Sequence, residues 1–147
     1  MTGRFDTYGP PSVELSAFRL WVHGREFPEA TDSIDGNFLR ITAHCAEKGA
    51  SVVTTGSLLD TVSFVRFGTA LQGLYDRLEG VAVLESYEPE LRVTVNACGP
   101  TGRMEVRVEI TPDHMNQTHS FEFVVDQSYL PKVVHQCAKV LGEYPVR

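Results

Sequence analysis

The residues best suited to chemistry are two aspartates that stand shortly before a Gly-Asn pair. In the stretch DSIDGN, Asp32 and Asp35 could supply carboxylates to a calcium ion, to a basic partner or to the backbone of a turn. A calcium loop with Gly36 in its sixth place would have Thr31 first and Thr42 twelfth, where acids are needed. The stretch therefore predicts a metal-free turn, in which the aspartates bond their own backbone.

The histidines and cysteines form no pattern typical of a metal site or a nucleophile. Asp113, His114 and His119 share one predicted loop, but their spacing matches no zinc-ligand pattern. His44 and Cys45 are neighbours on a predicted strand, where successive side chains point to opposite faces, so they cannot pair directly. The sequence also contains no P-loop and no G-x-S-x-G elbow. We therefore expect no catalytic residues, no bound metal and no cofactor.

The composition is that of an acidic globular domain. The chain has 147 residues, of which 42% are hydrophobic and 22% are charged, and its formal net charge is −6. A nucleic-acid-binding domain usually carries a basic surface, so we expect no nucleic-acid partner. We also expect no membrane span and no signal peptide, because the apolar runs are too short. The three widely spaced cysteines favour a reducing, cytoplasmic setting.

We expect a single domain over residues 1–147. Residues 1–12 are predicted to be a loosely ordered lead-in, because Gly9 and two prolines interrupt any regular pattern there. Trp21 points away from the apolar face of its predicted strand. Two interpretations of this tryptophan stay open: a contact with a helix or a contact with a partner.

Alternating apolar and polar residues predict β-strands along most of the chain. In the stretch RMEVRVEIT, the residues Met104, Val106 and Val108 face one way, while arginines and glutamates face the other. A hairpin turn is predicted at Lys48-Gly49. Such alternation is typical of antiparallel strands with one solvated face.

Two stretches have a helical period instead. Apolar residues recur at intervals of three and four between Thr61 and Glu79, and Gly80 suits the left-handed residue after such a helix. A second helix is predicted to begin at a Ser128 cap and to stop at Pro145. The expected fold is α+β: a twisted antiparallel sheet of about six to seven strands, with both amphipathic helices packed on its apolar face.

The polar side of this predicted sheet carries a ladder of mixed charge. If strands 103–111 and 119–125 are neighbours, their glutamates and arginines share one exposed face. This face is either solvated, with ion pairs that contribute tenths of a kcal/mol each, or an acidic docking surface for a basic protein. In the second interpretation the two aspartates of DSIDGN lie near its rim. The candidate partner-binding residues are Glu105, Glu109, Glu122, Asp32 and Asp35.

Four stretches, taken in order, resemble the WapI-like immunity family: FRLWVHGREFPEATDSIDGNFLRI, LLDTVSFVRFGTALQGL, ESYEPELRVTV and FEFVVDQSYLPKVVHQCAKVLGEYPVR. The matching features are F-P-x-A-x-D-x-x-D-G-N before an apolar pair, E-P-x-L after a long helix, and a last helix that ends near Pro-x-Arg. The resemblance covers the chain from Phe18 to Arg147, with Phe38 where the family pattern has tryptophan.

The resemblance implies a small bacterial protein that accompanies a contact-dependent or polymorphic toxin. Such a protein is not an enzyme: it neutralises the cognate toxin domain by binding it. The resemblance assigns no role to any single residue. Two alternatives stay open on the residues alone, a small cytosolic enzyme and a housekeeping homodimer, so homo-oligomerisation is also open.

Overall fold

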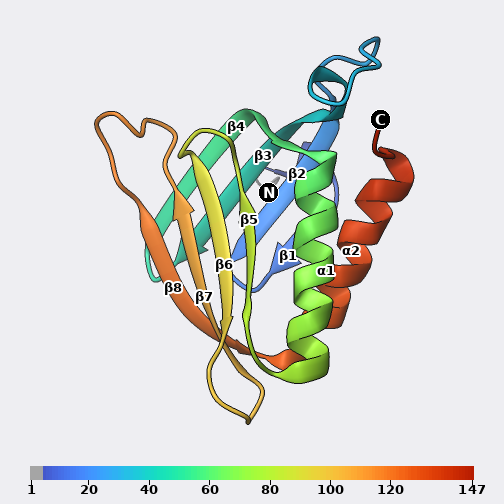
Figure 1. The fold of residues 1–147 in the computed structure, drawn as a ribbon. Helices are drawn as coiled ribbons and strands as arrows, with labels where there is room; N and C mark the ends of the chain where they lie inside the picture. The colour runs from blue at the N-terminus through green and yellow to red at the C-terminus, as the bar shows by residue number, and fades with distance from the viewer. Residues whose placement is uncertain (1–4) are drawn as a thin grey trace.

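The computed structural model describes residues 5–147, which form two antiparallel four-stranded sheets and two α-helices (Figure 1). Sheet A contains, in spatial order, β1 (Val13–Leu15), β2 (Phe18–Arg25), β3 (Phe38–Glu47) and β4 (Ala50–Asp60). Sheet B contains β5 (Val81–Glu85), β6 (Leu91–Ala97), β7 (Arg103–Ile110) and β8 (Ser120–Asp126). The helices are α1 (Thr61–Arg77), which joins the sheets, and α2 (Leu130–Glu143), which follows β8.

The predicted α+β class is confirmed, but the prediction of a single sheet with six to seven strands is wrong. α1 separates the fourth strand from the fifth, and within residues 5–147 no strand of sheet A pairs with a strand of sheet B. Alternation along a strand shows which of its faces is buried, but it does not show which strand lies beside it. The hydrophobic pattern therefore could not predict the division into two sheets.

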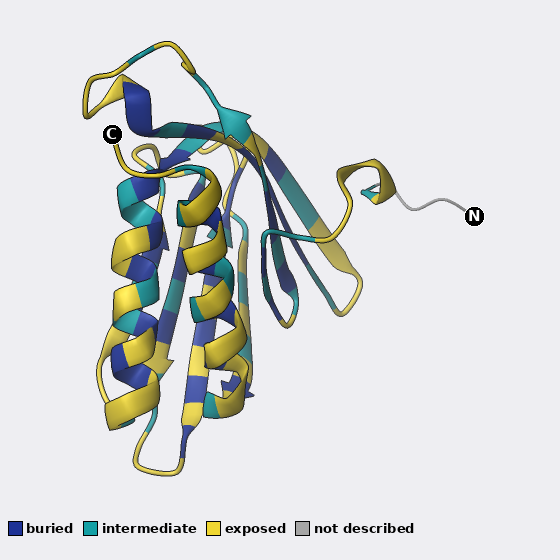
Figure 2. Cartoon of the chain, turned by 90° about the vertical axis from the view of Figure 1, so that its right-hand side faces the viewer, coloured by how far each residue is buried: buried dark blue, intermediate teal, exposed yellow. Residues whose placement is uncertain are grey.

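The inner faces of both sheets and the two helices enclose one hydrophobic core. β7 packs against β3 and β4, while α1 runs along β5 and α2 lies beside α1 and β1 (Figures 1 and 2). Met104, Val106 and Val108 are buried as predicted, and Phe123 is only partly buried. The helices close the side of the core between the edge strands β5 and β1. The helices do not cover the whole inner face of sheet B, because β3 and β4 of sheet A pack against β7.

Local signals account for several element ends. Lys48 and Gly49 have φ angles of 51° and 89°, which confirms the predicted hairpin and matches a two-residue type I′ turn. The left-handed residue directly after α1 is Leu78, with φ of 55°, where the sequence suggested Gly80. Gly80 has its own positive φ of 103° and leads into β5.

The start of α2 differs from the prediction by one element. A single 3₁₀ turn, Gln127–Tyr129, precedes the helix. The carboxylate of Asp126 accepts the N–H of Ser128 at 2.7 Å and also its hydroxyl, so Asp126 caps the 3₁₀ turn. The N-cap of α2 is Tyr129, without a side-chain hydrogen bond, so Ser128 does not cap the helix. The helix ends at Glu143, before Pro145, as predicted.

Trp21 is covered by the chain's own N-terminal segment. Its side chain lies on the outer face of sheet A and is only 3% exposed. The rings of Phe5 and Tyr8 lie 4.9 and 5.6 Å from its ring, and its indole N–H donates to the carbonyl of Gly9 at 3.0 Å. Part of the predicted lead-in therefore packs on sheet A, whereas residues 1–4 lie outside the described chain.

Candidate partner-binding surface

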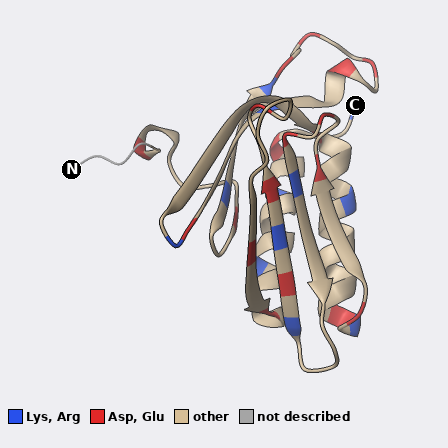
Figure 3. Ribbon diagram, turned by 90° about the vertical axis from the view of Figure 1, so that its left-hand side faces the viewer, with Lys and Arg blue, Asp and Glu red and all other residues tan. Residues whose placement is uncertain are grey.

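The outer face of sheet B carries the predicted charge ladder (Figure 3). β7 pairs with β8 without a register shift, which confirms that the two strands are neighbours. Arg107 lies opposite Glu122 and is 3.4 Å from both the Glu122 and the Glu109 carboxylates. Arg103 lies 4.0 Å from Glu105. The structure therefore brings together three of the five predicted partner-binding residues.

The ladder is largely neutralised within the molecule. Five carboxylates face three guanidinium groups, so the outer face of sheet B has a net charge of −2. The carboxylates belong to Glu85, Glu105, Glu109, Glu122 and Asp126, and the guanidinium groups to Arg92, Arg103 and Arg107. Exposed ion pairs of this kind contribute about 0–1 kcal/mol each to stability. The face is thus better suited to exchanging ion partners than to holding the fold together.

The other two predicted residues lie on a separate loop. Asp32 and Asp35 belong to the segment between β2 and β3, which projects beyond the end of the sheets, near the end of α2 (Figures 1 and 3). The Asp32 carboxylate accepts the N–H groups of Asp35 at 2.8 Å and Ile34 at 3.1 Å, and these hydrogen bonds lower the pKa of Asp32. Asp32 thus shapes the predicted turn. The hydrogen bonds of Asp32 stay within its own loop, and the role of both aspartates in partner binding stays a prediction.

The loop between β2 and β3 is fixed by a residue that the sequence reasoning missed. Asn37 is 1% exposed, and its amide N–H₂ donates to the carbonyls of Ser33 at 2.9 Å and Arg147 at 3.1 Å. Its amide oxygen accepts the Thr61 hydroxyl and the Arg147 N–H, both at 2.8 Å. All four hydrogen-bonding positions of the side chain are occupied.

The side chain of Arg147 completes this attachment. Its guanidinium donates to the carbonyls of Pro28 at 2.7 Å and Ala30 at 2.6 Å. Arg25 donates in the same region to the carbonyls of Gly36 and Pro145. The D-x-x-D-G-N motif and the Pro-x-Arg motif lie far apart in the sequence, yet they form one structure.

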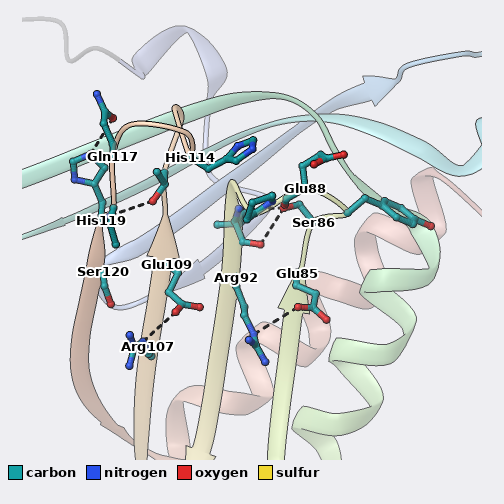
Figure 4. A pocket seen from close by; sticks show the side chains of 15 residues that line it. Glu85, Ser86, Glu88, Arg92, Arg107, Glu109, His114, Gln117, His119 and Ser120 are labelled. Atoms are coloured by element: carbon teal, nitrogen blue, oxygen red, sulfur yellow. Dashed lines mark hydrogen bonds and ion pairs between the residues drawn. The ribbon is translucent and has the colours of Figure 1, made fainter.

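A hollow of about 440 Å³ lies at the end of sheet B, but it lacks a catalytic arrangement (Figure 4). His119 contacts Gln117 at 3.1 Å, while His114 lies 3.6 Å from Glu90 on the other side, so the two imidazoles point apart. The hydroxyl of Ser86 donates to main-chain carbonyls, not to an imidazole. Within residues 5–147 no group of three or more His, Cys, Asp or Glu side chains could hold a metal ion.

Comparison with protein families shows what kind of protein this is. The family model described as Immunity protein WapI-like family matches residues 12–145. The chain belongs to the WapI-like immunity protein family. This confirms the resemblance seen in the sequence, and with it a toxin-neutralising immunity function of a typically non-enzymatic kind. Neither the curated proteins nor the solved structures gave a match. Neither helix in the described part of this family member is long and apolar enough to cross a membrane.

Proposed function

We propose that this protein neutralises a cognate toxin domain by binding it directly, and that the outer face of sheet B is its docking surface. Family membership is the observation that carries the first part. The second part is supported by the position of Glu105, Glu109 and Glu122, which project from strands held in a fixed register. A rigid strand surface orders few side chains on binding, which lowers the entropic cost of association.

Charge gives this surface a kinetic role. The whole chain has a net charge of −6, so it attracts a basic domain over a distance of about 8–10 Å at ordinary salt concentrations. At the surface, basic side chains of the toxin domain can replace Arg107 as partner of the ladder carboxylates. Such replacement contributes specificity and speed of association more than affinity.

The experiment is co-expression with the toxin domain encoded beside this gene, scored by survival and by isolation of a stable complex. The double variant Glu105→Lys/Glu109→Lys reverses two charges of the ladder. The matched control, Glu79→Lys/Glu143→Lys, makes the same change in net charge at exposed positions, one shortly after α1 and one at the last residue of α2. We expect the ladder variant to associate about tenfold more slowly at low salt, and with weaker salt dependence, than the control.

Two results would overturn the proposal in separable ways. Equal association rates of the two double variants would show that the ladder face does not dock the toxin domain. Protection without any complex would show that neutralisation does not proceed by direct binding to that domain.

We further propose that the protein acts in the cytoplasm, since Cys45, Cys98 and Cys137 are all free thiols. The homodimer alternative stays a prediction, and sedimentation of the free protein would test it.

A further inference from the structure

The edge strand β8 has a row of main-chain groups with no neighbouring strand. β8 is the last strand of sheet B, and among residues 5–147 no strand pairs with its far side. At the two ends of its pairing with β7, Ile110 N–H donates to the His119 carbonyl at 3.1 Å and Gln127 N–H donates to the Gly102 carbonyl at 2.8 Å. Along an antiparallel pair of strands, every second residue forms main-chain hydrogen bonds with its partner strand. The N–H and C=O groups of Ser120, Glu122 and Val124 therefore point away from β7.

Helices lie beside two of the other three edges of the two sheets. β5 lies along α1, and β1 has three residues and lies beside α2. β4 has a bulge where its register with β3 shifts between Leu39 and Ile41, but residues 50–56 keep a regular register. The choice between β4 and β8 therefore rests on the side chains and charges that surround β8. β8 has seven residues and contains no proline, lysine or register shift. Val124, near its middle, is 52% exposed.

The inward side of β8 is also incompletely covered. Phe121 and Phe123 point toward the core, yet both remain only partly buried. A strand added beside β8 would place alternate side chains on the inner side, against these two rings, and the others on the outer side, next to Glu122. An added strand would therefore bury apolar area and complete the hydrogen-bonding edge at the same time.

Charge decides which kind of strand fits. Glu122 and Asp126 stand on the outer side of β8, and Glu105 lies on the neighbouring strand opposite Val124. A second copy of this chain would bring the same carboxylates against one another, which disfavours β8–β8 pairing. A strand with basic side chains at its outer positions and apolar side chains at its inner positions complements both features.

We propose that the toxin domain adds such a strand to β8, so that sheet B continues from the immunity protein into its partner. This inference rests on the proposed function and specifies its geometry. It also assigns Glu122 a place at the centre of the contact, with Glu109 farther from the added strand.

The test combines amide exchange with an edge-blocking variant, and uses the toxin domain encoded beside this gene as the probe. On binding, the N–H groups of Glu122 and Val124 should exchange at least about tenfold more slowly, because they become hydrogen-bonded. Val124→Pro removes one outward N–H and should weaken binding at least about tenfold. Val81→Pro is the matched control, since Val81 is 53% exposed on the edge strand that α1 already covers.

A second variant guards against loss of fold. Val124→Lys leaves the main-chain N–H groups intact. It places a cation beside the expected basic side chains of the added strand, so repulsion should also weaken binding. Binding by the toxin domain with unchanged exchange at Glu122 and Val124, and with unchanged affinity of both Val124 variants, would overturn strand addition while leaving the proposed function in place. Absence of binding by the unaltered protein would overturn the proposed function and this inference together.

Discussion

Replacement of Asn37 tests whether a single buried amide holds the β2–β3 loop, the start of α1 and Arg147 together. Asn37→Ala removes four hydrogen bonds, two donated and two accepted by the side chain. A typical intramolecular hydrogen bond contributes about 1 kcal/mol net, and a buried partner left unsatisfied costs about 1–3 kcal/mol. The Thr61 hydroxyl is fully buried and would lose its partner. We therefore expect Asn37→Ala to lower the free energy of unfolding by about 3–4 kcal/mol.

The assay is equilibrium unfolding in urea, with the stability compared between the parent protein and each variant. A matched control is Asn96→Ala, because Asn96 is an exposed asparagine on the outer face of sheet B. Its replacement should change stability by no more than about 0.5 kcal/mol. The change for Asn37 is a large fraction of the about 5–15 kcal/mol that stabilises a domain of this kind, so it should be visible as a clear shift of the midpoint.

A loss below about 1 kcal/mol for Asn37→Ala would refute this reasoning, since water would then replace the side chain without cost. The double variant Asn37→Ala/Arg147→Ala gives an independent check. Both side chains hold the same loop, so their effects should overlap, and the double variant should be less destabilised than the two single variants added together by about 0.5–3 kcal/mol. Strict additivity would show that the Asn37 and Arg147 contacts act separately.

Three further predictions follow from local geometry. Gly36→Ala should destabilise the protein by about 1–3 kcal/mol in urea unfolding, because the added methyl group would lie 2.9 Å from the Ala30 carbonyl oxygen. Gly142→Ala is the control: apart from its chain neighbours and the nearby backbone of its own helix, its added methyl group would meet no atom within 4 Å, so this variant should be as stable as the parent protein or more stable. In the folded protein only Cys98 should react rapidly with a thiol reagent, because burial raises the pKa of the other two cysteines to about 12; fast labelling of all three thiols without urea would contradict this. Burial, and secondarily the nearby Arg40, lower the pKa of His23 below its ordinary 6.5. The unfolded chain therefore binds this proton at higher pH than the folded protein does, and the free energy of unfolding should fall as pH drops below about 6.5. His23→Asn should make this pH dependence weaker, and an unchanged pH dependence would exclude His23 as its origin.

Local chemistry gave the elements and their solvent-facing sides. The helix predicted from Thr61 begins at that residue, and the turn at Lys48-Gly49 has the positive φ angles that its composition favours. The strand period fixes which side chains of each strand point outward. The outward glutamates of 103–111 and 119–125 share one exposed face because β7 also pairs with β8. The predicted start of α2 at Ser128 was too early, because a 3₁₀ turn, capped by Asp126, precedes the helix.

Tertiary structure decided everything that depends on residues far apart in the chain. Asn37 and Arg147 are separated by 110 positions, and no local pattern shows that the first holds the second. The division into two sheets, the cover over Trp21 and the open edge of β8 are of the same kind, because each depends on which elements become neighbours. The sequence by itself determined the period, the charge and the family motifs, since these are properties of short segments. Only the folded chain determined that two of those motifs form one structure and that no strand within residues 5–147 pairs with the far side of β8, because burial and pairing arise when distant segments meet.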